Sequence, residues 1–185
     1  MEKKVDLKSP FTGGPVKEVV TTEEMEFRGE KYPDIPVRYY VCEDTGEQFT
    51  DGEQDEEWTN ILYGKYRKKY GIPSPSEIRA TRERYGLNVS QMTRILGFGK
   101  NQLAWYEDGQ VPSLSNGRLL SLIQDPKIMR KCVELAPLEE EEKKRILWKI
   151  KQAAHAPSVV QAQVVPSVAE DVKVTYGNPK ADKPE

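Results

Sequence analysis

Residues 100 to 106 combine side chains whose types and spacing fit a surface that reads nucleic-acid bases. Leu103 and Tyr106 lie three residues apart, so in a helix both would face the protein core. The side chains left on the outer face are Lys100, Asn101, Gln102 and Trp105. Asparagine and glutamine can pair bidentately with adenine, and a lysine at the helix start can bind guanine or phosphate. The segment is therefore a candidate recognition helix for the DNA major groove; the alternative is a helical domain whose outward polar side chains are merely solvated.

Two capping boxes predict the helices that precede this segment. Ser74 and Glu77 have the required spacing, with a proline at the first helical position between them. Asn88 and Gln91 have the same spacing and predict a short helix at 89–96. A turn follows, and the next helix is expected at roughly 100–108. Together these signals predict a helix-turn-helix.

Three further helices are expected after the candidate recognition helix. Segments 113–124 and 125–135 would cover the core of the first three helices, and Asp125 caps the second of them. An amphipathic helix at 137–152 begins with glutamates and continues with basic residues, which matches the helix dipole. Residues 153–185 show no apolar period and are interpreted as a flexible tail.

The first 54 residues are interpreted as short strands separated by turns. Segments 15–20, 25–32 and 36–42 are rich in Val, Tyr and Phe. The aromatic side chains expected in this small core are Phe11, Phe27, Tyr39 and Phe49. A connecting helix at 55–71, capped by Asp55, is expected to join the strands to the helical part.

Charge is distributed unevenly along a chain whose formal net charge is only -2. Residues 43–57 include eight acidic side chains and no lysine or arginine, whereas residues 60–100 include nine basic side chains and two acidic ones. A cationic block of this kind suits a module that approaches phosphate. The alternative is a pair of solvated helix faces.

The segment 86–112, GLNVSQMTRILGFGKNQLAWYEDGQVP, resembles the helix-turn-helix of the Xre/Cro repressor family. The likeness lies in a Leu-Gly turn at 96–97, an aromatic-Glu-x-Gly ending at 106–109, and a proline at 112. Phosphate contacts are expected from Ser90 at the start of the second helix and from Arg94 and Lys100. Arg79 and Arg82 have two open roles, DNA contact or internal pairing with a glutamate.

Two short segments have the outline of zinc knuckles of the form C-x-x-C-G. They are Ser9-Pro10-Phe11-Thr12-Gly13 and Cys42-Glu43-Asp44-Thr45-Gly46, in which only Cys42 occupies a ligand position with a thiol. The chain resembles the MqsA (YgiT-type) antitoxin family over about residues 5–136. The resemblance lies in the order of its parts: knuckle-like turns, strands around Phe27-Arg28-Gly29, a connecting helix and an Xre-type domain.

This second resemblance implies that the two halves of the chain have different functions. In the MqsA family the N-terminal domain binds zinc and a small ribonuclease toxin, while the C-terminal domain dimerises and represses its own operon. The resemblance places the DNA-reading asparagine at Asn101 and puts Trp105 where the family has an arginine. With three ligands lost, no zinc is expected here.

Several functional classes are excluded by composition. Two cysteines and one histidine in 185 residues cannot build a disulfide framework or a closed Cys/His zinc site. No 18-residue apolar run occurs, so no membrane span is expected, and the expected compartment is the cytoplasm with nucleoid association. We find no catalytic triad, phosphate-binding loop or paired carboxylates, and we predict neither an enzyme nor a cofactor.

The sequence thus predicts an α+β protein made of a small β-rich domain (1–54), a connecting helix (55–71), a helix-turn-helix domain (72–136), an amphipathic helix (137–152) and a tail (153–185). The predicted function is a sequence-specific DNA-binding transcriptional regulator. It would act as a homodimer through residues 113–136 on a palindromic operator and serve as the autoregulating antitoxin of a type II toxin-antitoxin system, with a protein toxin as partner. The alternatives are a stand-alone repressor and a protein-binding adaptor without a toxin.

Overall fold

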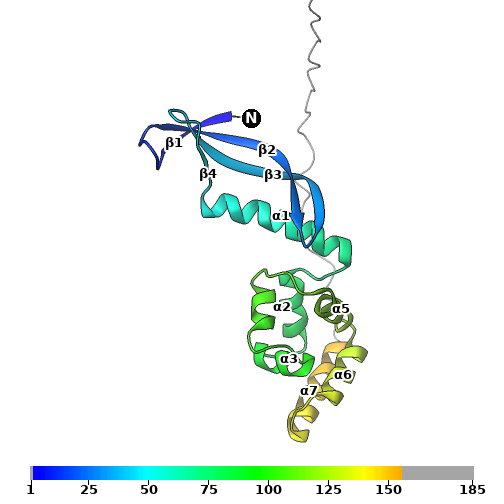
Figure 1. Ribbon diagram of the computed structural model, residues 1–185. Helices are drawn as coiled ribbons and strands as arrows, with labels where there is room; N and C mark the ends of the chain where they lie inside the picture. The colour runs from blue at the N-terminus through cyan, green and yellow to red at the C-terminus, as the bar shows by residue number, and fades with distance from the viewer. Residues whose placement is uncertain (1, 156–185) are drawn as a thin grey trace, which may run out of the picture. The chain divides into compact units, whose positions relative to one another are not determined.

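The computed structural model describes residues 2–155 and shows a mixed α+β fold, as expected. A four-stranded antiparallel sheet is followed by seven helices (Figure 1). In sheet order the strands are β1 (Glu2–Lys8), β2 (Pro15–Phe27), β3 (Glu30–Cys42) and β4 (Gln48–Phe49). β2 and β3 pair from Val16 opposite Cys42 to Phe27 opposite Glu30, and they form one long hairpin.

The hairpin turn corrects one strand prediction. A strand was expected across 25–32, but Arg28 and Gly29 both have positive φ, 54° and 78°, and reverse the chain there. Positive φ at both residues of a two-residue loop is the pattern of a type I′ turn, which matches the twist of the flanking strands. β1 was not expected at all.

The connecting helix α1 (Gly52–Tyr70) starts three residues earlier than predicted. Its N-cap is Asp51, whose carboxylate accepts a hydrogen bond from the Gln54 amide at 2.8 Å. The Gln54 side chain in turn accepts from the Asp51 amide, which completes a capping box. The prediction of Asp55 as the cap was therefore wrong. Gly71, with φ of 62°, ends the helix.

The core of the sheet lies between β3 and α1. Its buried side chains are Tyr32, Ile35, Val37, Leu62, Tyr66, Ile72 and Val111. Of the four aromatic residues expected in this core, Phe11 was predicted wrongly, since 49% of it is exposed. Its ring packs against that of the half-buried Phe49. Phe27 and Tyr39 are half-buried, and Phe27 packs against this core as expected. The buried positions themselves are filled by aliphatic side chains and tyrosines.

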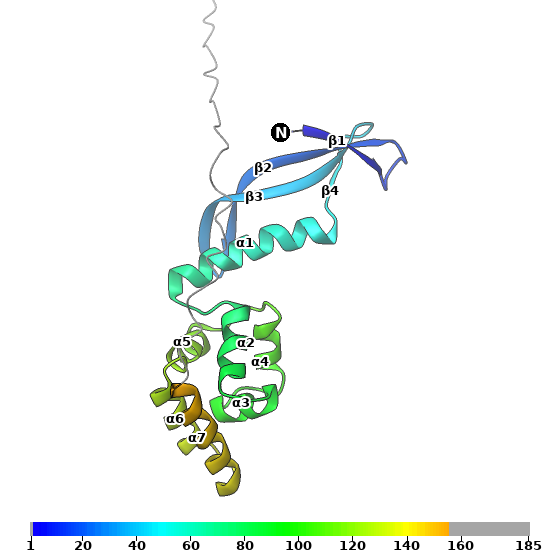
Figure 2. The same ribbon diagram turned by 180° about the vertical axis from the view of Figure 1, so that it is seen from behind.

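Six helices follow α1 (Figures 1 and 2): α2 (Pro75–Arg84), α3 (Val89–Leu96), α4 (Gln102–Glu107), α5 (Leu114–Leu122), α6 (Pro126–Leu135) and α7 (Glu140–His155). Both predicted capping boxes, at Ser74 with Glu77 and at Asn88 with Gln91, are confirmed. Asp125 also caps α6 as predicted. The sequence thus predicted correctly the helix starts that are determined by hydrogen bonds between residues close in the chain.

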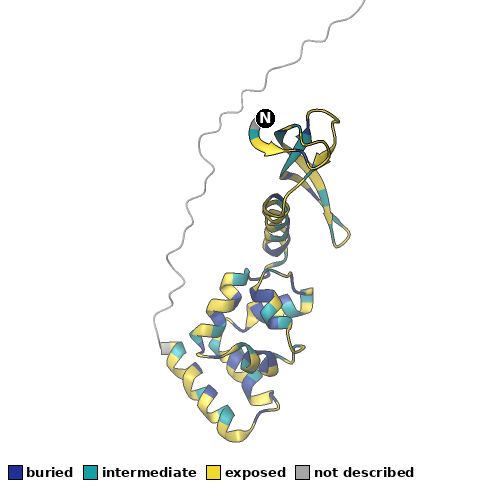
Figure 3. Cartoon of the chain, turned by 90° about the vertical axis from the view of Figure 1, so that its left-hand side faces the viewer, coloured by how far each residue is buried: buried dark blue, intermediate teal, exposed yellow. Residues whose placement is uncertain are grey.

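These helices share one apolar core, which Figure 3 shows as the dark residues on their inner faces. Tyr85 is fully buried, and its hydroxyl donates to the Ile123 carbonyl at 2.8 Å. α7 contributes Ile146 and Ile150 to this core. It runs to His155, three residues past the predicted end, and the rest of the predicted tail lies outside the described residues. Within residues 2–155 no helix is both long and apolar enough to cross a bilayer.

Candidate functional site

The candidate site is the turn before α4 together with the exposed side of that helix. α4 begins at Gln102, two residues after the predicted start, so Lys100 and Asn101 lie in the turn. The side-chain carbonyl of Gln102 accepts a hydrogen bond from the Gly99 amide at 3.0 Å, which fixes the helix start one residue after Asn101. Asn101 occupies the N-cap position without making a side-chain cap.

The structure places the predicted reading residues at the surface. Trp105 is 52% exposed, Lys100 and Asn101 are exposed, and Gln102 is half-buried. Within residues 5–154, the side chains of Lys100, Asn101 and Trp105 make no hydrogen bond or ion pair. An open hollow of about 380 Å³ is lined by Trp105, Asp108 and Gln110. These groups are therefore available to an external ligand.

The inner side of α4 is fixed by buried contacts. Leu103 is fully buried and Tyr106 nearly so. Arg82 of α2 donates to both carboxylate oxygens of Glu107, at 2.6 and 2.9 Å, and also to the Leu87 carbonyl at 3.0 Å. The hydrogen bond to Glu107 raises the pKa of Arg82. Of the two roles left open for Arg82, the structure shows internal pairing.

Arg79 belongs to the same cluster but is more exposed. Its Nε lies 3.5 Å from Glu107, and its Nη2 lies 3.8 Å from Asp108. Half of its side chain remains accessible. Arg79 thus pairs internally while retaining contact with solvent.

The two remaining predicted contacts lie on α3, where α7 changes their surroundings. Ser90 is exposed at the start of α3. Arg94, expected to contact phosphate, donates instead to Glu142 of α7 at 2.6 Å. Arg94 and then Gln91 lower the pKa of Glu142. Sequence reasoning missed this pair because the glutamates of α7 were interpreted only as helix-dipole partners.

The two knuckle-like turns at the far end of the sheet are equivalent in backbone geometry. In the first turn the Ser9 amide donates to the Gly14 carbonyl at 2.9 Å, and the Ser9 carbonyl accepts from the Gly13 amide at 2.8 Å. In the second turn the Cys42 amide and carbonyl make the same two bonds, to Glu47 and Gly46, at the same distances. The two glycines have φ of 74° and 75°. Thr12 Oγ1 lies 3.6 Å from Cys42 Sγ, so the turns face each other.

Cys42 is buried between these turns among hydroxyl groups. Hydrogen bonds from Ser9 first, and then from Thr45, lower its pKa from 9.0 to about 6 against the opposing effect of burial. Among the described residues, no group of three His, Cys, Asp or Glu side chains is placed to hold a metal ion. Hydroxyl groups thus occupy the positions that the knuckle pattern assigns to thiolates.

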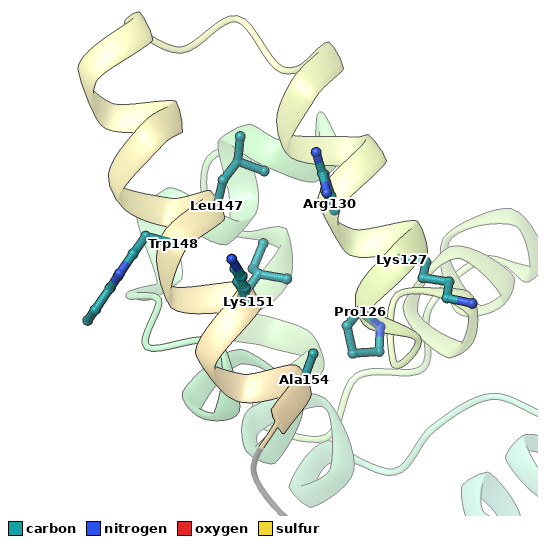
Figure 4. Close-up of a pocket in the computed structure, with 8 residues that line it drawn as sticks. Pro126, Lys127, Arg130, Leu147, Trp148, Lys151 and Ala154 are labelled. Atoms are coloured by element: carbon teal, nitrogen blue, oxygen red, sulfur yellow. The ribbon is translucent and has the colours of Figure 1, made fainter.

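A groove of about 470 Å³ lies between α6 and α7 (Figure 4). Its lining residues are Pro126, Lys127, Arg130, Leu147, Trp148, Ile150, Lys151 and Ala154. Trp148, one of the residues that line the groove, is 64% exposed. No sequence signal located this groove, because it depends on how two separate helices pack.

Comparisons of the chain with family models, with curated proteins and with solved structures found no match.

Proposed function

We propose that the protein is a sequence-specific DNA-binding regulator whose reading surface is formed by Lys100, Asn101, Gln102 and Trp105. The observation that carries this proposal is the contrast between the two sides of α4. Its inner side is fixed by a buried arginine-glutamate pair, while among the described residues the side chains of Lys100 and Asn101, just before its start, have no partner. Rigid support behind unpaired amide and cationic groups is what a base-reading helix requires.

The resemblance to the Xre/Cro helix-turn-helix further supports this function. In that arrangement α3 would cross the DNA backbone while the N-terminal part of α4 enters the major groove. Ser90 and the free amides at the start of α3 would contact phosphate. With Arg94 engaged by Glu142, we assign the main phosphate contact of this surface to Lys100.

Selection of binding sites from random duplex DNA tests this function directly. The proposal expects one enriched, palindromic motif, and it expects affinity for that motif to fall steeply as salt rises. Weak binding that is the same for every sequence would instead favour the adaptor alternative. Recovery of no bound DNA at low salt would contradict the proposal.

The antitoxin role is a second candidate, and the equivalent turns at Ser9 and Cys42 favour it. Their matched hydrogen bonds fit a zinc-knuckle pair that has lost its metal, as the resemblance to the MqsA family implies. In this role the sheet would bind a toxic protein partner, and DNA binding would serve autoregulation. A small neighbouring reading frame that is lethal when expressed alone and harmless with this protein would support it, whereas a harmless neighbour would count against it.

A further inference from the structure

The loop that follows α4 is held by two arginines from outside the helical core. Arg28, at the tip of the β2–β3 hairpin, donates to the Pro112 carbonyl at 2.6 Å and to the Val111 carbonyl at 2.7 Å. Arg67 of α1 donates to the Gly109 carbonyl at 2.5 Å. Three carbonyls within four residues therefore accept from guanidinium groups that belong to the sheet and to α1.

The position of Arg28 is fixed by its surroundings. Its guanidinium lies 5.1 Å from the ring centroids of both Phe27 and Tyr66, which is within the range of cation–π attraction. Its φ of 54° is unusual for a residue other than glycine, asparagine or aspartate. The tight turn places this side chain against the loop, and the two carbonyls match its two terminal nitrogens.

Apolar packing reinforces the same junction. Val111 is buried in the cluster of the sheet and α1 rather than in the core of the other helices. Gly117 of α5 approaches Ile72 so closely that an added Cβ would lie 2.7 Å from it. The loop also stays close to the reading surface, because the Gln110 amide donates to the Trp105 carbonyl at 2.9 Å.

We propose that Arg28 is a positioning residue for the reading surface: the hairpin tip holds the 109–112 loop and thereby sets the orientation of α4 on DNA. This inference rests on the proposed DNA-binding function. The sheet would then contribute to DNA recognition without contacting DNA. A ligand that draws the hairpin tip away from the loop would weaken DNA reading.

Arg28→Ala in the full chain tests this inference, with Arg28→Lys as the conservative variant. Arg38→Ala is the matched control, since among the residues that the structure describes Arg38 pairs with Glu18 and Glu57 of the sheet and α1, away from the 109–112 loop. Arg28 is solvent-accessible, so we expect its variants to fold, and a thermal melt checks this. The first readout is amide hydrogen exchange at residues 109–111, which needs no DNA. The second is the ratio of affinities for the selected site and for random DNA.

We expect Arg28→Ala to speed exchange at the Gln110 amide roughly tenfold and to lower the affinity ratio by a similar factor, equivalent to ~1.4 kcal/mol. Arg28→Lys should recover part of both effects, because an ammonium group cannot span two carbonyls as a guanidinium does. A purely structural defect would lower both affinities together and leave their ratio unchanged.

Two results would overturn the inference: unchanged exchange in Arg28→Ala, or faster exchange with an unchanged affinity ratio. If the wild-type chain binds no DNA, the proposed function fails, while the exchange measurement still decides whether Arg28 holds the loop.

Discussion

Arg82 and Glu107 form a two-point ion pair that joins α2 to the end of α4, with distances of 2.6 and 2.9 Å. Only 12% and 4% of their side chains are exposed, so each charge depends mainly on the other for its solvation. The further ion pairs, from Arg79 to Glu107 and from Arg82 to Glu83, are longer, at 3.5 Å each. The pair of Arg82 and Glu107 fixes the inner side of α4, behind the proposed reading surface.

Glu107→Gln should destabilise the protein by about 3 kcal/mol, because it removes the closest and most buried counter-ion of the Arg82 charge. Chemical denaturation followed by circular dichroism measures the loss. Arg79→Ala is the control, since that more exposed arginine should contribute less than ~1 kcal/mol. The double variant Arg82→Met with Glu107→Leu should recover most of the stability. A Glu107→Gln variant as stable as the wild type would refute this role of the pair.

Glu30 predicts an acid-dependent loss of stability. Hydrogen bonds from Tyr70, then from Tyr32 and Lys69, lower its pKa from 4.5 to about 2. The folded state therefore favours the carboxylate, and this contribution to stability is fully present above pH 4.5 and is lost as the pH falls toward 2.

Unfolding free energies measured across this pH range should fall more steeply in the wild type than in Glu30→Gln. Glu24→Gln, which removes an exposed pair with Lys31 on the same hairpin, is the control and should follow the wild type. Equal slopes for Glu30→Gln and the wild type would contradict the assignment.

The equivalent turns predict that a zinc site can be built between them. Thr12 Oγ1 and Cys42 Sγ are 3.6 Å apart, close to the ~3.8 Å between thiolates that tetrahedral zinc with bonds of about 2.3 Å requires. The triple variant Ser9→Cys, Thr12→Cys and Thr45→Cys should bind zinc stoichiometrically and melt at a higher temperature with the metal than without it. Elemental analysis measures the content. The matching triple alanine variant is the control, and a zinc-free cysteine variant would show that the turns are not knuckle-like.

The dimer prediction can be tested at Leu135. This residue is 83% exposed, and Leu122 of α5 is 54% exposed, both within the predicted dimer surface 113–136. A dimer interface formed by this segment would cover both side chains. Leu135→Glu should convert a dimer to a monomer in sedimentation experiments. Leu7→Glu, at a 42% exposed position on β1, should leave the dimer intact. A wild-type monomer at all concentrations would contradict the prediction.

The sequence predicted the helical half well because its signals are local. Ser74 with Glu77, and Asn88 with Gln91, are separated by three residues, and their side chains cap the backbone whatever surrounds them. The start of α1 shows the limit of such signals. Asp51 and Asp55 are both good caps, and Gln54 at the third helical position decides for Asp51.

Contacts between distant segments could not be predicted in the same way. Arginine is an uncommon residue in a turn with positive φ, so the hairpin turn at 28–29 was interpreted as part of a continuous strand. The pairing of Arg94 with Glu142 spans 48 residues and depends on how α7 packs. For the candidate site, helical periodicity correctly predicted the exposed position of Trp105, but the turn conformation of Asn101 required the structure.

The central claim, that residues 100–105 read DNA, is tested most directly by comparing Asn101→Ala with Lys100→Ala on the selected site and on random DNA. Lys68→Ala, at an exposed lysine of α1 outside the proposed DNA and dimer surfaces, is the control. Loss of a bidentate base contact in Asn101→Ala should lower the affinity ratio roughly tenfold or more. Lys100→Ala should weaken binding to both DNAs alike and reduce the slope of log affinity against log salt by about 1. Selected-site binding that is the same in both variants as in the wild type would contradict the claim.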